Sequence, residues 1–152
     1  MTFIVDGTNG LTFNNSTTQA SAGVVLQVVQ ATTTSAATTT STSYVTTGFS
    51  ASVTPKFSTS KILITVSSTA VNSAGANMRF TVYRNSTPLD SGGNGLTILG
   101  SASIIPVNIT YLDSPATTSS TTYTVYFFAP TGTSTFGTAS TTSSITLMEI
   151  AA

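Results

Sequence analysis

The stretch Lys61-Ile-Leu-Ile-Thr-Val66 places isoleucine or valine at every second position, and Met78-Arg-Phe-Thr-Val-Tyr83 repeats this alternation with other apolar residues. A period of two is that of a β-strand with one buried face. Tyr123-Thr-Val-Tyr-Phe-Phe128 is apolar on both faces, which predicts a strand that packs against a second sheet or another subunit. These three segments indicate an all-β fold.

Several further segments have the same character, and turn-forming residues separate them. They are residues 23–31, 43–47, 49–53, 96–99, 104–111 and 144–150. Short strands with turns between them predict an antiparallel β-sandwich or jelly roll. Residues 32–43 are almost entirely Thr, Ser and Ala, and this composition fits either a flexible loop or an exposed strand edge.

Residues 1–23 differ from the rest, because they are rich in Asn, Gly and Thr and contain only two short apolar pieces. We expect an extended N-terminal arm over residues 1–23 and a single β-sandwich domain over residues 24–152. An arm with little core of its own is typical of a segment that reaches onto a neighbouring subunit. The predicted contact residues of the arm are Phe3, Ile4, Leu11 and Phe13.

The composition removes most of the groups from which active sites are built. Thr and Ser account for 57 of the 152 residues, and there is no His, Cys or Trp. A catalytic hydroxyl needs a neighbouring base, usually His, and zinc prefers His and Cys. The carboxylates Asp6, Asp90, Asp113 and Glu149 are scattered, and Asp90 and Asp113 have turn-like contexts where Asp commonly bonds its own backbone. We expect no enzymatic activity, no metal and no other cofactor.

Charge and hydropathy restrict the partners. Only eight residues are charged and the net charge is zero. Four cations cannot form the surface that neutralises nucleic-acid phosphates. No apolar run is long enough to span a bilayer, and the N-terminus lacks the pattern of a signal peptide. We expect synthesis in the cytoplasm, no binding to nucleic acid or membrane, and self-association, since weak charge gives little repulsion between copies.

The segment Gly10-Leu-Thr-Phe-Asn-Asn-Ser-Thr-Thr-Gln-Ala-Ser-Ala-Gly23 resembles a stretch common in virion proteins of tailed bacteriophages, especially tail-fibre proteins. The resemblance continues through Val25-Leu-Gln-Val-Val29, Thr47-Gly-Phe-Ser50, Val53-Thr-Pro55 and Ser60-Lys-Ile-Leu63, and covers residues 10–66. Asn14-Asn15 stand where the family usually has Asp-Gly, and Asn also tolerates left-handed turns.

The resemblance implies a virion structural protein made in the host cytoplasm, and it brings no catalytic residues. A chain of this length fits a trimeric capsid decoration (cement) protein that bridges capsomers. Its arm would then grip a neighbouring subunit or the major capsid protein. The alternative is a short tail fibre or tail-tip protein that binds a host-surface receptor. Tyr44 or Tyr111 would stack on the receptor's sugar rings, although burial in the sheet is the expected use of both.

Overall fold

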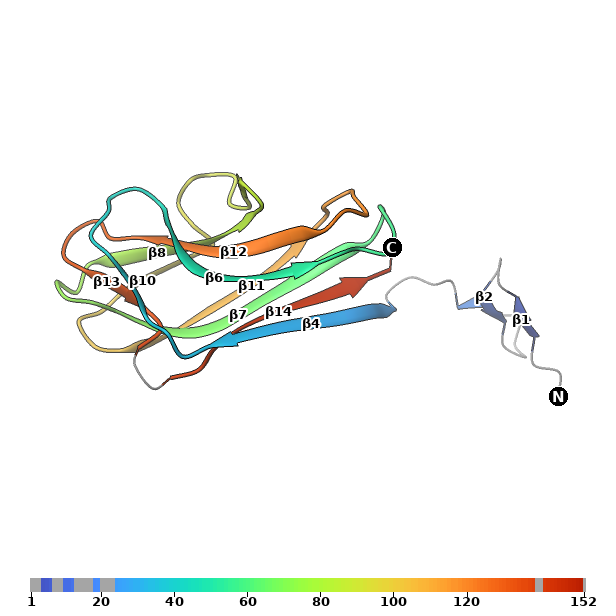
Figure 1. Ribbon diagram of the computed structural model, residues 1–152, viewed down its shortest axis with the longest axis horizontal. Coiled ribbons are helices and arrows are strands. Elements are labelled where there is room, and N and C mark those ends of the chain that lie inside the picture. The colour runs from blue at the N-terminus through green and yellow to red at the C-terminus, as the bar shows by residue number, and fades with distance from the viewer. Residues whose placement is uncertain (1–3, 7–9, 13–17, 20–23, 139–140, 152) are drawn as a thin grey trace.

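Two antiparallel sheets pack face to face as a sandwich (Figure 1). The computed structural model describes residues 4–6, 10–12, 18–19, 24–138 and 141–151. The first sheet contains β4 (Val25–Thr33), β14 (Ser143–Ile150), β7 (Lys61–Asn72) and β11 (Ile105–Asp113), with the short strands β5 (Ala37–Thr39) and β13 (Ser134–Phe136). The second sheet contains β10 (Thr97–Gly100), β8 (Asn77–Arg84), β12 (Thr121–Phe128) and β6 (Val45–Val53), and β9 (Thr87–Pro88) pairs with β8.

The strand pairing is that of a jelly roll. Strand β4 pairs with β14, β6 with β12, β7 with β11, and β8 with β10. The first long strand of the sandwich therefore meets the last, and the pairing proceeds inward along the chain. A set of strand pairs rolled up in this way gives two packed four-stranded layers. The predicted all-β antiparallel sandwich is confirmed, and its connectivity is a jelly roll.

Three short strands precede the sandwich. They are β1 (Ile4–Asp6), β2 (Gly10–Thr12) and β3 (Thr18–Gln19), and they pair antiparallel in that order. The N-terminal segment that we expected to be an extended arm thus contains paired strands of two or three residues each.

The core lies between the inner faces of the two sheets, and a group of phenylalanine rings forms its centre. The Phe136 ring of β13 lies 6.0 Å from Phe80, 6.5 Å from Phe127 and 6.3 Å from Phe49, measured between ring centroids. These three rings belong to the second sheet, so Phe136 joins the sheets at this point. Aromatic side chains bury large areas, and burial contributes roughly 25 cal/mol per Å².

Strand β6 corrects one prediction. Residues 43–47 and 49–53 were expected as two strands, but they form one strand with a bulge. Ser50 lies opposite Thr124 and Thr46 lies opposite Tyr126, so three residues of β6 face the single residue Val125. Gly48 lies between them with a φ of 77°, a conformation that glycine adopts without strain. The glycine therefore marks a bulge and not a strand end.

The sequence pattern misses the strands β5, β9 and β13, as well as the N-terminal strands β1, β2 and β3, because two or three residues are too few to show a period. Strand β5 also decides between the two alternatives for residues 32–43. Strand β4 extends to Thr33, a turn follows, and β5 pairs with β13. Residues 32–33 and 37–39 of this hydroxyl-rich segment are therefore strand, and residues 34–36 and 40–43 are turn or loop.

Candidate functional site

Hydroxyl side chains cross the outer face of the first sheet in rows. Thr146 on β14 lies between Gln30 on β4 and Thr65 on β7, and Thr110 on β11 continues the row. Gln30 donates from Nε2 to Thr146 Oγ1 at 2.9 Å. The next row consists of Thr32, Ser144, Ser67 and Asn108. Many of the Thr and Ser residues thus form an uncharged polar sheet surface.

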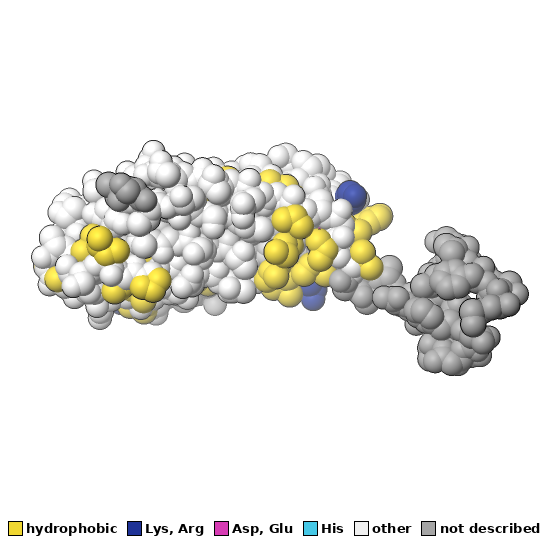
Figure 2. All heavy atoms as spheres, turned by 90° about the horizontal axis from the view of Figure 1, so that it is seen from below, with side chains coloured by type: hydrophobic (Ala, Val, Ile, Leu, Met, Phe, Trp, Pro, Cys, Tyr) yellow, Lys and Arg dark blue, Asp and Glu magenta, His cyan; other side chains and the backbone are white. Residues whose placement is uncertain are grey.

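One end of the same face is aliphatic. Met148 lies between Val28 and Leu63, and Leu112 lies beside Leu63 on the next strand. Val28 is 55 % exposed and Leu112 is 48 % exposed. The aliphatic patch, as we name it, consists of Val25, Val28, Leu63, Leu112, Met148 and Ile150. Figure 2 shows hydrophobic side chains gathered toward the end of the sandwich where β4 begins. Exposed apolar surface that crosses four strands is typical of a contact with another protein chain.

A buried carboxylate lies on the inner side of the sheet beside this patch. Glu149 has no exposed surface, and it accepts hydrogen bonds from the backbone N–H of Lys56 at 2.6 Å and from Gln27 Nε2 at 2.5 Å. Gln27 Nε2 also donates to the carbonyl oxygen of Thr54 at 2.8 Å. These bonds tie β4 and β14 to the loop after β6, so they fix the end of the sheet that carries the patch.

Burial alone would raise the pKa of Glu149. Hydrogen bonds donated by Gln27 and by the backbone N–H groups of Lys56 and Phe57 outweigh burial and lower the pKa. The Ser60 hydroxyl lies beside the same carboxylate, although it falls short of hydrogen-bond geometry. The ionised form of Glu149 is therefore the one that this environment stabilises.

Glu149→Gln is expected to lower the free energy of unfolding at neutral pH by about 2 kcal/mol, since hydrogen bonds to a charged acceptor are the stronger ones. The folded-state pKa of Glu149 lies below its ordinary value of 4.5. The carboxylate thus stabilises the fold above about pH 4.5, and this contribution is lost as the pH falls through the lower folded-state pKa. Urea denaturation of both proteins on acidification should show the difference between them shrinking. A difference that stays constant on acidification would contradict this role.

Asp90 and Asp113 also make structural hydrogen bonds. Asp113 accepts from Arg84 at 2.9 Å and from the Tyr123 hydroxyl at 2.7 Å, and it joins β11 of one sheet to β8 and β12 of the other. The expectation that Asp113 bonds its own turn is wrong, because the packing of the sheets buries it against these partners. Asp90 does bond its own loop, through the backbone N–H of Gly95 at 2.9 Å. None of the three sits beside another carboxylate at these contacts.

The two tyrosines considered for glycan stacking are both engaged in packing. The Tyr44 ring meets Phe128 edge-on, with centroids 5.0 Å apart. Burial of the Tyr44 hydroxyl raises its pKa to about 12, with the charge of Asp90 adding to the effect. Tyr111 packs against the hydrophobic core. Both tyrosines are partly buried and take part in the packing of the sandwich.

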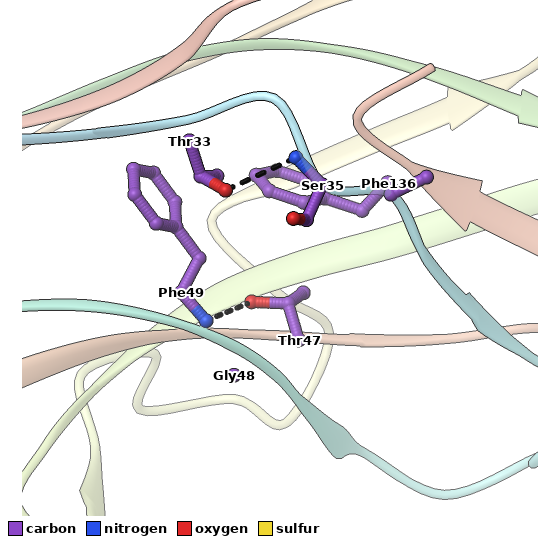
Figure 3. A pocket seen from close by; sticks show the side chains of 7 residues that line it. Thr33, Ser35, Thr47, Gly48, Phe49 and Phe136 are labelled. Atoms are coloured by element: carbon purple, nitrogen blue, oxygen red, sulfur yellow. Dashed lines mark hydrogen bonds between the residues drawn. The ribbon is translucent and has the colours of Figure 1, made fainter. Parts of the chain in front are cut away.

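A pocket of about 250 Å³ opens between the end of β4 and the bulge of β6 (Figure 3). Its lining residues are Thr33, Ser35, Ala36, Thr47, Gly48, Phe49 and Phe136. Phe136 is 1 % exposed and Phe49 is 8 % exposed, so both rings belong to the core beneath the pocket and offer little surface to a ligand. Hydroxyl groups also line the pocket, and the lining contains no ionisable side chain. No local sequence pattern predicts this site, because its residues come from three strands and a turn.

The predicted contact residues of the N-terminal segment stay predictions. Phe3 and Phe13 lie outside the described residues. Ile4 belongs to β1 and lies opposite Thr12, and Leu11 belongs to β2.

Metal ligands and membrane spans give no further candidate. No group of three or more His, Cys, Asp and Glu side chains that could hold a metal ion occurs in the part of the chain that the structure describes. Within the same residues, no helix has the length and apolar character needed to cross a membrane.

No protein family matches this chain, and no curated protein is significantly similar to it.

Proposed function

We propose that this chain is a structural subunit of a tailed-phage virion that assembles with copies of itself into a trimer and carries out no chemistry. The aliphatic patch is the observation that carries this proposal. It offers apolar side chains from four adjacent strands on one outer face, beside rows of uncharged hydroxyl groups.

The energetics favour burial of this surface. Complete burial of one Val, Leu or Met side chain contributes roughly 1.5–3 kcal/mol. The six side chains of the patch are already partly buried, so each contributes only part of that value toward the association cost, which is roughly 4–15 kcal/mol. The net charge of zero imposes no repulsion between copies. The surrounding Thr, Ser and Gln side chains can form hydrogen bonds across a subunit contact. Lys61 lies opposite Ile150 at the border of the patch and is exposed, so its long side chain can keep its charge in water.

The resemblance of residues 10–66 to tailed-phage virion proteins supports the proposal that the assembly is a phage virion. A single sandwich domain with a short N-terminal segment favours a capsid decoration protein that binds the major capsid protein, with Phe3, Ile4, Leu11 and Phe13 as contacts. The hydrogen bonds of Asp90, Asp113 and Glu149 support a role without catalysis, because all three carboxylates are used by the fold.

Immunogold labelling of intact phage particles with an antibody against this chain tests the proposal. Label over the head is the expected result. Label at the tail would favour the tail-fibre alternative instead. Particles that contain no copy of the chain would overturn the virion assignment altogether.

A further inference from the structure

The loop between β9 and β10 contains the dipeptide Asn94-Gly95, and the Asn94 side chain is exposed. Asparagine followed by glycine is prone to deamidation, because glycine has no side chain to hinder attack by its backbone nitrogen. In this reaction the Gly95 nitrogen bonds to Cγ of Asn94, and the side-chain nitrogen leaves as ammonia together with the proton of the Gly95 N–H. Water then opens the cyclic imide and leaves aspartate or isoaspartate at position 94. The reacting groups are therefore the Gly95 N–H and the Asn94 side-chain amide.

A carboxylate holds the first of these groups. Asp90 Oδ2 accepts a hydrogen bond from the backbone N–H of Gly95 at 2.9 Å. Asp90 Oδ1 accepts from Thr81 Oγ1 at 2.6 Å, and Thr81 is fully buried in β8, so the carboxylate has a fixed position. Attack requires the Gly95 nitrogen to lose its proton, and the negative charge of Asp90 disfavours a second negative charge beside it. The carboxylate therefore keeps this nitrogen protonated and unreactive.

A guanidinium holds the second group. Arg79 Nη1 donates to Asn94 Oδ1 at 2.6 Å. The Arg79 guanidinium lies 5.3 Å from the centroid of the Phe128 ring, and this cation–π contact keeps it in place. The hydrogen bond ties the Asn94 side chain to β8. Since the cation also polarises the Asn94 carbonyl, the protection depends mainly on the Asp90 carboxylate.

The packing of the loop leaves little room for the product. A Cβ at Gly95 would lie 2.8 Å from the carbonyl oxygen of Phe80 and 2.7 Å from the Tyr44 hydroxyl. The backbone N–H of Leu96 donates to the same Phe80 carbonyl at 2.8 Å, so the main chain is bonded to β8 directly after this contact. Isoaspartate would add one methylene to the main chain at position 94. Its formation would therefore displace the loop from β8.

We propose that Asn94 is a site of hydrolytic deamidation, and that the Asp90 carboxylate protects it while the loop is folded. The site is independent of the assembly proposed above, because the loop packs on β8 of the second sheet and the aliphatic patch lies on the first sheet. Deamidation adds one negative charge to a chain whose net charge is zero, so it changes both the charge and the mass of the protein.

Peptide mapping by mass spectrometry, after incubation of the full chain at mildly alkaline pH, measures the deamidation rate of Asn94. We expect this rate to be more than about 10-fold lower in the folded chain than in the same chain unfolded in urea. Asp90→Asn preserves the size of the side chain and removes its charge. It should raise the rate in the folded chain about 10- to 100-fold, the range that corresponds to one hydrogen bond with a charged acceptor.

The chain supplies its own reference, because a second Asn-Gly dipeptide occurs at Asn9-Gly10. The rate at Asn9 should be the same in the wild type and in Asp90→Asn, which separates local protection from general unfolding. Ser91→Ala changes an exposed residue of the same loop and should deamidate at Asn94 as the wild type does. Equal rates at Asn94 in the folded and the urea-unfolded wild type would overturn the proposal, and this comparison needs no substitution. A rate at Asn94 in folded Asp90→Asn no higher than that of the wild type would overturn it as well.

Discussion

Met148→Glu is expected to leave the protein monomeric under conditions in which the wild type is fully assembled. Met148 occupies the centre of the aliphatic patch, between Val28 and Leu63. A glutamate there would place an unpaired carboxylate in the contact, which costs at least about 3 kcal/mol for each copy. That cost weakens each contact more than about 100-fold. Light scattering coupled to size-exclusion chromatography measures the change directly.

Thr124→Glu serves as the control for this change. It adds the same charge at the outer face of β12, in the sheet that does not carry the patch. Both substitutions replace outward-facing side chains, so circular dichroism should show the same β-structure in the two variants. We expect Thr124→Glu to assemble as the wild type does. Equal oligomeric mass in the two variants would exclude the patch as the contact surface.

Phe136→Ala is expected to lower the free energy of unfolding by about 4 kcal/mol, a value typical of a buried phenylalanine. The ring contacts Phe49, Phe80 and Phe127, so its removal leaves a cavity between the two sheets. In a chain of this length, each kcal/mol lowers Tm by roughly 2–4 °C. Calorimetry at fixed protein concentration should therefore show a decrease of roughly 8–16 °C.

Phe57→Ala provides the comparison, because Phe57 is 55 % exposed in the loop after β6. The same deletion at this position should change the free energy of unfolding by less than about 0.5 kcal/mol. A loss of similar size in both variants would mean that Phe136 is not the centre of the core.

The long strands were predictable because alternation over six or more residues is set by burial of one face. Residues 61–66 and 78–83 therefore gave β7 and β8 correctly in type and in the identity of the buried face. Strand β13 carries the central core residue Phe136, yet three residues cannot show a period. Gly48 was interpreted as the end of a strand for a related reason. Local sequence does not show how a strand pairs with its neighbour, and only the pairing of β6 with β12 shows that Gly48 lies in a bulge.

The aliphatic patch could not be predicted without knowledge of the register of the sheet. Val28, Leu63 and Met148 each stand out as apolar residues on the solvent side of an amphipathic strand, and this signal is present in the sequence. Whether they meet depends on pairings between strands more than 30 residues apart in the chain, which no local pattern contains. The pocket could not be predicted from the sequence for the same reason, because its lining residues come from β4, β6, β13 and a turn.

The mass of the full wild-type chain in solution tests the central claim most directly. Sedimentation equilibrium at micromolar concentration should give three times the chain mass of 15.5 kDa, with no monomer at the upper end of the range. A mass of 15.5 kDa throughout the micromolar range would contradict assembly through the aliphatic patch.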